Sequence, residues 1–344
     1  MIKMNIIKDS DLKLIKGKLE DGNIDLNRLC RKLISLKKVI AVCGPTCTGK
    51  SKIGIIMAKL INTDIISVDS MQVYRGMDIG TDKYDSGEYG IKQFMTDMFE
   101  PDHSLSVVEF KDICRNIIDK YFFKKKKIPL MVGGSGLYMR SVIKNVDTLP
   151  KGDEAIRKRI KDDIKREGIK KYYLKLKKID KKYAQKISEN DQRRLIRALE
   201  VYEMTGIPFS NFQNVWKNGK DEYGSVLIGM EMNRPELYEC IEKRVDEMFE
   251  RGLVSEVTDL VKKGYKNCNS ILQAVGYKEV IKYLNEEISL DECIYEVKRN
   301  TRRLAKKQMT WFRAEPGINW IRVSNYDNIF KLIFDIFKLL NKGI

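Results

Sequence analysis

The stretch AVCGPTCTGKSKIGIIMAKL, residues 41–60, decides the fold of this chain because it joins an apolar run to a helical pattern through a glycine-rich loop. Residues 44–51, GPTCTGKS, match the pattern G-x-x-x-x-G-K-[ST], which chains of this length contain by chance on the order of once in a hundred. Between a strand and a helix, the backbone N–H groups of such a loop surround phosphate groups. The sequence therefore predicts a phosphate-binding loop, the motif of ATP-binding and other nucleotide-binding enzymes, without specifying the reaction.

Two side chains of this loop have particular roles in the prediction. Lys50 would neutralise the phosphate charge, and Ser51 would bind the accompanying Mg²⁺. The predicted phosphate-binding residues are Gly44, Pro45, Thr46, Cys47, Thr48, Gly49, Lys50 and Ser51.

The order of strand and helix patterns predicts a parallel sheet. TDIISVDS at 63–70 and IPLMVGGSG at 128–136 are further strand-then-turn runs, SVLIGMEM at 225–232 is a strand that returns to the sheet, and INWIRVS at 318–324 is a late strand. Repeated strand–helix units imply right-handed crossovers and a parallel sheet flanked by helices. We predict an α/β fold of the P-loop NTPase type with a helical insertion domain. Its parts are an N-terminal helical extension (1–37), the α/β core (38–149 and 221–344) and a Lys- and Glu-rich helical insertion (150–220).

Composition limits the function classes. The formal charge of +17 suits a polyanionic partner such as a nucleic acid, although a general bias towards Lys, Ile and Asn would give the same charge. Seven scattered cysteines and a single histidine argue against a zinc site or a disulfide framework. Because no long uncharged apolar run or signal peptide is evident, we expect a cytoplasmic protein without membrane segments.

A carboxylate follows one of the predicted strands. PLMVGG ends in glycines, whereas IISVDS ends in Asp69 and leads into DSMQVYRGMDIGTDK at 69–83. An ATP hydrolase of this class needs a carboxylate at a strand end to reach its metal ion. This segment combines an acid, small polar residues, a tyrosine and a glycine-rich turn. A metal ligand alone would not require all of these residues.

Several blocks of the chain resemble one family in order and spacing. They are GPTCTGKS, DSMQVYRGMDIGTDK, VGGSGLYMRS, DQRRLIRALEVYEMTGIPFS, RVDEMFERGLVSEV, AVGYKE and TRRLAKKQMTWFR. From about residue 38 to about residue 323 the chain resembles the bacterial tRNA dimethylallyltransferases, also called tRNA isopentenyltransferases. The resemblance implies transfer of a dimethylallyl group from dimethylallyl diphosphate to N6 of adenosine 37, next to the anticodon of tRNAs that read UNN codons, with release of pyrophosphate.

The chemistry of this reaction suggests a role for each candidate catalytic residue. An adenine amino group is a poor nucleophile, so a carboxylate that takes its proton would help, and Asp69 is the candidate base. Lys50, Ser51 with Mg²⁺ and, by resemblance, Arg244 would stabilise the charge on the leaving diphosphate. The plainer interpretation of Arg244 is a solvated helix residue paired with Asp246 or Glu247. The hydroxyl of Ser135 would touch the donor or the adenosine, or cap the following helix.

A base inside an anticodon loop must be drawn out of its stack, which requires contacts to the surrounding RNA. By resemblance these contacts come from the helical insertion and from turns of the core. The predicted tRNA-binding residues are Asp69, Ser70, Met71, Gln72, Ser135, Arg157, Arg193, Arg194, Leu195, Ile196, Arg197, Gln273, Gly276, Tyr277 and Lys278. Arg193 and Arg197 would share one helix face.

The block TRRLAKKQMTWFR predicts a basic helix that faces either RNA or the donor phosphates. Arg302 and Lys306 share a face with Met309 and Arg313, and Arg303 shares another with Lys307. We expect Trp311 and Phe312 to pack in the core.

The chain departs from the family at KQFMTDM, residues 92–98, where relatives usually have His-His-Leu-Ile-Asp. Lys92 and Gln93 or their neighbours replace the paired histidines, and we interpret His103, a few residues later, as a surface loop residue. Three alternatives stay open: an adenylate isopentenyltransferase acting on AMP or ADP, a P-loop small-molecule kinase, and an RNA-binding module with a decayed site. We expect a monomer.

Overall fold

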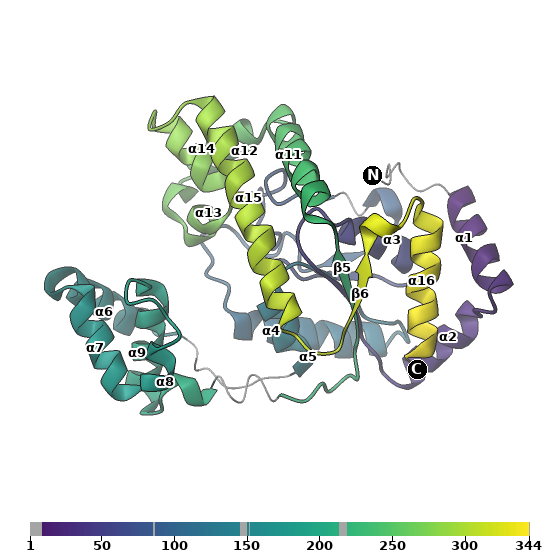
Figure 1. The fold of residues 1–344 in the computed structure, drawn as a ribbon, viewed down its shortest axis with the longest axis horizontal. Helices are drawn as coiled ribbons and strands as arrows, with labels where there is room; N and C mark the ends of the chain where they lie inside the picture. The colour runs from purple at the N-terminus through teal and green to yellow at the C-terminus, as the bar shows by residue number, and fades with distance from the viewer. Residues whose placement is uncertain (1–8, 85–86, 145–149, 151, 213–218, 344) are drawn as a thin grey trace. The chain divides into compact units, whose positions relative to one another are not determined.

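The structure, a computed structural model, describes residues 9–84, 87–144, 150, 152–212 and 219–343 (Figure 1). The chain forms two compact units: unit 1 comprises residues 1–143 and 222–344, and unit 2 comprises residues 144–221. Each unit has a hydrophobic core of its own. None of the helices in the described ranges is long and apolar enough to cross a membrane.

Unit 1 is built on a six-stranded parallel sheet with the strand order β3-β2-β4-β1-β5-β6. The strands are β1 (Ile40–Cys43), β2 (Ile65–Ser67), β3 (Gln93–Phe94), β4 (Leu130–Gly133), β5 (Val226–Glu231) and β6 (Ile318–Arg322). Val42 of β1 is in register with Val132 of β4 and Ile228 of β5. A strand covered on both faces is apolar at every position, which explains the run VIAVC. The parallel α/β sheet expected from the sequence is confirmed.

Helices cover both faces of the sheet. Ala41 and Cys43 of β1 belong to the core of one face, and Ile40 and Val42 to that of the other, because successive strand side chains point to opposite sides. The first core takes residues from α4 (Val107–Ile117), η2 (Ile118–Phe123), α5 (Gly136–Lys144), α11 (Arg234–Glu250), α12 (Leu253–Lys262), α13 (Asn269–Gln273), α14 (Tyr277–Leu284) and α15 (Leu290–Arg313). Short 3₁₀ turns lie at Gly87–Tyr89, Tyr265–Asn267 and Val323–Asn325.

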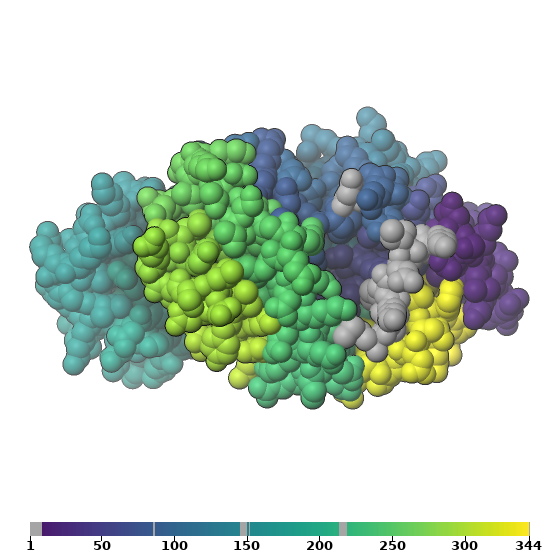
Figure 2. All heavy atoms as spheres, turned by 90° about the horizontal axis from the view of Figure 1, so that it is seen from above, coloured from purple at the N-terminus to yellow at the C-terminus, as the bar shows by residue number. Residues whose placement is uncertain are grey.

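The N-terminal helices contribute to the second core. α1 (Asp9–Asp21) and α2 (Leu26–Ser35) bury apolar side chains together with α3 (Lys50–Leu60) and α16 (Ile329–Lys342). α1 contacts both α3 and α16, and the purple N-terminal segment lies beside the yellow C-terminal helix (Figure 2). Leu19 and Leu33 are fully buried there. The described part of the extension therefore belongs to unit 1 and shares its second core.

The stretch KQFMTDM forms the edge of the sheet. Gln93 and Phe94 make up β3, which pairs with Ile65 and Ile66 of β2. The chain then turns sharply, with positive φ at Met95 and Asp97. The Lys92 ammonium lies 4.6 Å from the ring centre of Phe94.

Unit 2 is a bundle of short helices: α6 (Glu154–Glu167), α7 (Ile169–Ile179), α8 (Lys181–Ala184) and α9 (Gln192–Thr205). Its core includes Ile160, Leu176, Leu195 and Leu199. Asp191 caps α9 by accepting a hydrogen bond from the Arg194 N–H at 3.1 Å.

Candidate active site

The glycine-rich loop follows β1 and ends at the N-terminus of α3. Gly44 has φ +137°, and a Cβ there would lie 2.3 Å from the Met230 carbonyl oxygen of β5, so a side chain does not fit. Gly49 precedes α3 in the left-handed conformation, with φ +81°. The Thr48 hydroxyl donates to the Pro45 carbonyl at 2.9 Å and holds the loop in its curled form.

Lys50, the first residue of α3, is only 9% exposed. Its ammonium donates a hydrogen bond to the Pro45 carbonyl. Burial lowers the pKa of Lys50 to about 8, and the nearby Arg244 guanidinium acts in the same direction, while Cys47 and Asp69 act against it. A cation with so little solvent around it interacts strongly with an anion placed beside it.

A cavity of about 350 Å³ opens at this loop. It lies at the carboxyl ends of the strands, where ligands bind in open parallel sheets. Its lining includes Lys50, Ser51, Asp69, Gln72, Asp82 and Arg244. The structure thus brings the loop, the carboxylate after β2 and the arginine of α11 to one cavity.

Asp69 and Ser135 come from adjacent strand ends. Asp69 Oδ1 accepts a hydrogen bond from the Met71 N–H at 2.8 Å, which fixes the turn after β2. The Ser135 hydroxyl oxygen accepts from the Ser70 N–H at 3.2 Å and so joins the turn after β4 to the Asp69 turn. The hydroxyl is therefore bonded across to the neighbouring turn.

Arg244 faces the loop. Its Nη1 donates to the Thr46 hydroxyl at 2.7 Å and to Cys47 Sγ at 3.6 Å, and it lies 3.4 Å from Asp82 Oδ2. The plainer interpretation, a pair with a neighbouring acid on the same helix, is wrong. Those acids pair elsewhere: Asp246 with Lys298 at 2.6 Å and Glu247 with Lys243 at 3.9 Å.

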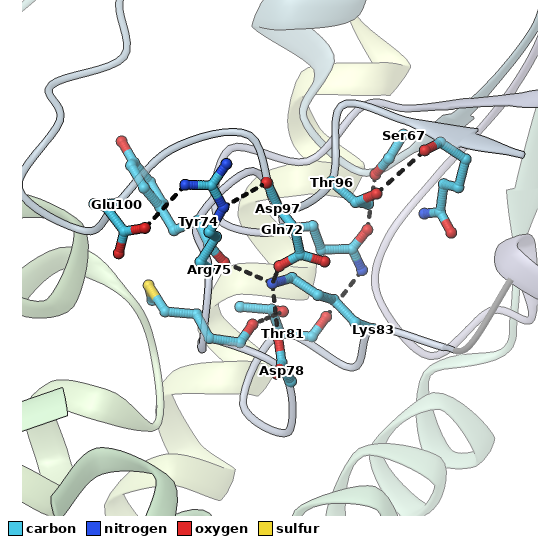
Figure 3. A network of polar contacts seen from close by, with 12 residues as sticks. Ser67, Gln72, Tyr74, Arg75, Asp78, Thr81, Lys83, Thr96, Asp97 and Glu100 are labelled. Carbon is cyan, nitrogen blue, oxygen red and sulfur yellow. Dashed lines mark hydrogen bonds and ion pairs between the residues drawn. The ribbon is translucent and has the colours of Figure 1, made fainter. Parts of the chain in front are cut away.

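The segment between Gln72 and Lys83 is closed into a compact loop by polar contacts (Figure 3). The Gln72 side chain accepts from the Ser67 hydroxyl at 2.7 Å and donates to the Thr81 carbonyl at 3.0 Å. Lys83 Nζ donates to Asp78 at 2.8 Å, to Asp97 at 2.6 Å and to the Tyr74 carbonyl at 2.6 Å. These contacts place Thr81 and Asp82 beside the cavity.

Gln308 of α15 is a cavity residue that the sequence did not indicate. Its Oε1 accepts from the Thr46 N–H at 2.9 Å, and its Nε2 donates to the Gly134 carbonyl at 3.2 Å. The position of Gln308 in the helix could have indicated its role. Ala305 and Phe312 are both 1% exposed, and Gln308 lies on the same face of the helix. A polar residue on a buried helix face must find partners inside the protein.

Glu256 of α12 was also missed. Its Oε2 accepts from the N–H groups of Asp78 at 3.0 Å and Ile79 at 2.7 Å, and its Oε1 accepts from the Gly80 N–H at 3.2 Å. The Tyr277 hydroxyl donates to the same Oε1 at 2.6 Å. Tyr277 is 0% exposed, and its burial together with the Glu256 carboxylate raises the pKa of its phenol.

The other predicted residues of unit 1 near Tyr277 differ in accessibility. Gln273 is exposed and Lys278 is half-buried, whereas Gly276 is buried with φ +98°. Tyr277 packs inside the protein and holds the Asp78–Gly80 turn through Glu256, so its side chain presents no surface to RNA. This corrects the sequence prediction for Tyr277.

In unit 2, Arg193 and Arg194 are exposed at the start of α9, and Ile196 is half-buried. Leu195 is fully buried in the core of unit 2, which corrects its prediction as an RNA-contacting side chain.

Arg157 and Arg197 are held within unit 2 by one carboxylate. They lie 3.0 Å and 2.8 Å from the two oxygens of Glu200, which is 0% exposed. Arg197 also donates to the Pro150 carbonyl at 2.7 Å. The two arginines therefore balance a buried charge, a function that the sequence did not indicate.

The basic helix at 302–313 is partly neutralised. Arg302 lies 2.5 Å from Glu242 and Arg313 lies 3.6 Å from Glu231, whereas Arg303 and Lys306 are exposed. Phe312 is buried and Trp311 packs against the same core, so the expectation of core packing for this pair is confirmed.

His103 is more constrained than a surface loop residue. Its ring stacks on Phe99 with the ring centres 4.2 Å apart, and its Nε2 lies 3.0 Å from Glu109 Oε1. None of residues 92–98, all of them described, lines the cavity.

The parallel sheet carries a glycine-rich loop between an inner strand and a helix, and a cavity lined by both basic and acidic side chains lies at the strand ends. These features define an α/β protein of the P-loop type. Family profiles agree: the profile described as IPP transferase matches residues 72–315, and that described as isopentenyl transferase matches residues 37–89. This chain belongs to the tRNA dimethylallyltransferase family, as the resemblance predicted.

Relatives in both sequence and structure support this assignment. The tRNA dimethylallyltransferase of Carboxydothermus hydrogenoformans is 46% identical over 286 residues, covering 83% of this chain and 91% of the relative. That of Acetivibrio thermocellus is 43% identical over 302 residues, covering 87% and 96%.

The chain is also similar to solved structures. The tRNA isopentenylpyrophosphate transferase of Bacillus halodurans matches with a TM-score of 0.66 at 38% identity, covering 89% of this chain and 98% of that one. A eukaryotic dimethylallyltransferase acting on tRNA matches with a TM-score of 0.70 at 28% identity, covering 84% and 74%.

Proposed function

We propose that this protein transfers the dimethylallyl group of dimethylallyl diphosphate to N6 of adenosine 37 in tRNAs that read codons beginning with U, releasing pyrophosphate. The observation that carries the proposal is the meeting of Lys50, Arg244 and Asp69 at one cavity. The two cations suit the diphosphate of the donor, and the carboxylate suits the amino group that attacks it.

In the reaction, a bond forms between N6 and the allylic carbon while the bond from that carbon to the diphosphate oxygen breaks. Lys50 and Arg244 would stabilise the negative charge that grows on the leaving diphosphate. Asp69 would accept the proton that N6 loses, since its turn after β2 ends at the cavity and its Oδ1 is fixed by the Met71 N–H. The proton thus moves to the carboxylate, and pyrophosphate leaves.

The residues around the loop fit a phosphate-bound Mg²⁺. Ser51 lines the cavity with the carboxylates of Asp69 and Asp82. In the described ranges no group of three or more His, Cys, Asp or Glu side chains is arranged to hold a metal ion by itself. Mg²⁺ keeps several waters and takes few protein ligands when substrate phosphates are present, so Ser51 would hold it together with the diphosphate. When bound, the ion would add Lewis-acid stabilisation of the leaving group.

A tRNA acceptor is favoured over a free nucleotide by unit 2. Arg193 and Arg194 are exposed at the N-terminus of α9, and the surrounding helices are rich in lysine. Exposed cations of this kind neutralise RNA phosphates, whereas AMP would need no such surface. A cytoplasmic location follows from the proposed substrate.

The experiment is to incubate the protein with dimethylallyl diphosphate, Mg²⁺ and either unmodified tRNA or AMP, and to detect prenylated adenosine by mass spectrometry after digestion. Asp69→Asn removes the base, yet its amide oxygen can still accept from the Met71 N–H, so the turn should survive. We expect product on tRNA alone and a loss of about 10²- to 10⁴-fold in kcat for Asp69→Asn. Asp259→Asn, at a side chain that is 62% exposed, is the matched control.

Product on AMP would instead assign the protein to the adenylate isopentenyltransferases. Turnover of ATP without RNA would favour the kinase alternative. Tight tRNA binding without any product would leave an RNA-binding module whose site has decayed.

A further inference from the structure

Gln308 connects the two glycine-rich turns of the site. One end of its amide accepts from the Thr46 N–H in the loop after β1, at 2.9 Å, and the other donates to the Gly134 carbonyl in the turn after β4, at 3.2 Å. The first turn would hold the donor diphosphate. The second carries Ser135, which is bonded to the Asp69 turn. A single side chain therefore touches both halves of the proposed reaction site.

The helix that carries Gln308 is firmly held against these turns. Ala305 and Phe312 of α15 are both 1% exposed on the same face. A Cβ added to Gly136 would lie 2.0 Å from Cε3 of Trp311, so this ring already fills the space beside the turn. Because α15 is fixed at these points, the Gln308 amide acts from a defined position.

The Gly134 position is shaped by Gln308. A Cβ added there would lie 2.4 Å from Gln308 Nε2, while the nearest backbone atom, the Gly44 carbonyl oxygen, would be at an ordinary 3.4 Å. Gly134 is not among the glycines with positive φ. An alanine at this position would therefore push the end of the Gln308 side chain aside, with no strain from its own backbone conformation.

We propose that Gln308 is a positioning residue that sets the spacing between the donor loop and the Ser135 turn, and with it the distance between the donor carbon and the adenosine amino group. The role needs one acceptor and one donor at the end of a long side chain, which glutamine supplies. Glutamate would keep the acceptor for Thr46 but would lose the donor to Gly134 and add a negative charge beside the diphosphate. Methionine would keep the length and lose both bonds. This inference rests on the proposed function.

The first test compares Gln308→Met with wild type and with Thr310→Met, which places the same side chain at an exposed position of α15. Calorimetry measures the affinity for inorganic pyrophosphate with Mg²⁺, and steady-state kinetics measures kcat and both KM values. For Gln308→Met we expect pyrophosphate to bind about ten-fold more weakly, from the loss of one loop hydrogen bond. We expect kcat to fall by about 10- to 100-fold from misplacement of the reacting groups, with the KM for tRNA unchanged. Gln308→Glu should bind pyrophosphate more weakly still.

The second test does not depend on turnover. Gly134→Ala should weaken pyrophosphate binding because its methyl group collides with Gln308. In a background that already carries Gln308→Ala, adding Gly134→Ala should leave pyrophosphate affinity unchanged, because the methyl group then has no glutamine amide to displace.

The proposal is overturned if Gln308→Met matches Thr310→Met in both affinity and kcat, or if Gly134→Ala weakens pyrophosphate binding as much in the Gln308→Ala background as in wild type. A fall in kcat that merely follows a fall in melting temperature would also overturn it, since that outcome indicates a general packing role. If wild type transfers no prenyl group, the proposed function fails, yet the dependence of the Gly134→Ala effect on Gln308, measured as pyrophosphate affinity, still decides whether Gln308 spaces the two turns.

Discussion

The substitution Glu256→Gln should lower the stability of unit 1 and loosen the turn beside the cavity. Glu256 accepts hydrogen bonds from the N–H groups of residues 78–80 and from the hydroxyl of Tyr277, at 2.6–3.2 Å. The turn leads into Asp82, which lies 3.4 Å from Arg244. The carboxylate therefore connects α12 and a fully buried tyrosine to the cation of the site.

The size of the effect follows from counting donors. Two donors bind each oxygen of the Glu256 carboxylate. A glutamine amide has only one oxygen, which can accept from one of these pairs. Its NH₂ group then faces the other pair. Each hydrogen bond to a charged group contributes about 1.5–3 kcal/mol, so losing two costs about 4 kcal/mol. At about 2–4 °C per kcal/mol for a unit of this size, the melting temperature should fall by about 10 °C.

Tyr277→Phe provides the second half of a double-mutant cycle. Alone it should cost about 1.5–3 kcal/mol, the contribution of one hydrogen bond to a carboxylate. Combined with Glu256→Gln it should cost less than the sum, because both substitutions remove the same hydrogen bond between Tyr277 and the carboxylate, which can be lost only once. Glu250→Gln, at an exposed position of α11, controls for the change of charge.

The assay is urea or thermal unfolding of the four proteins, with pyrophosphate affinity measured in parallel. A melting temperature for Glu256→Gln equal to that of Glu250→Gln would refute the reasoning. A Tyr277→Phe variant with unchanged stability but a raised KM for tRNA would show that this tyrosine contacts RNA, as the sequence suggested.

Four further outcomes are expected, from substitutions at three positions. Lys50→Met should weaken pyrophosphate binding at least about 100-fold. In wild type the pKa of Lys50 is lowered from 10.5 to about 8. Between these pH values the unfolded chain binds more protons than the folded one, so the contribution of Lys50 to the free energy of unfolding rises with pH. Unfolding in urea at several pH values should show this rise in wild type and not in Lys50→Met. Arg244→Lys keeps the charge but loses the hydrogen bond to Thr46. Calorimetry should find a pyrophosphate affinity about 10- to 100-fold lower. Lys243→Met, at an exposed position, is the control. Leu33→Ala in α2 should cost about 2–5 kcal/mol of stability, whereas Leu36→Ala, at a side chain that is 49% exposed, should cost little in the same melts.

The sequence was sufficient for the sheet and for the loop because both depend on local signals. Short apolar runs identified β1, β2, β4, β5 and β6, and the spacing of glycine, lysine and serine identified the loop. β3 was missed because it has only two residues and no apolar run of its own. Its position at the sheet edge depends on pairing with β2, which sequence spacing does not reveal.

The partners of the site residues were less predictable because they are distant in the chain. Gln308 lies 262 residues from Thr46, and Glu256 lies 178 residues from Asp78. Family blocks indicated the right regions but could not separate exposed from buried members. Arg193 and Leu195 belong to one block, yet the first is exposed and the second is 0% exposed because the helix turns about 100° per residue.

Charge also has to be considered together with its partners. The block that contains Arg197 suggested a free cation for RNA, but the buried carboxylate of Glu200 already takes both Arg197 and Arg157. Removing Glu200 would leave these two cations without the carboxylate that lies between them. Arg193 and Arg194 are exposed at the start of their helix. Substituting Arg193 or Arg194 should therefore lower RNA affinity and its salt dependence more than substituting Arg157 or Arg197. Only charges that can exchange counterions for RNA phosphates contribute to this affinity.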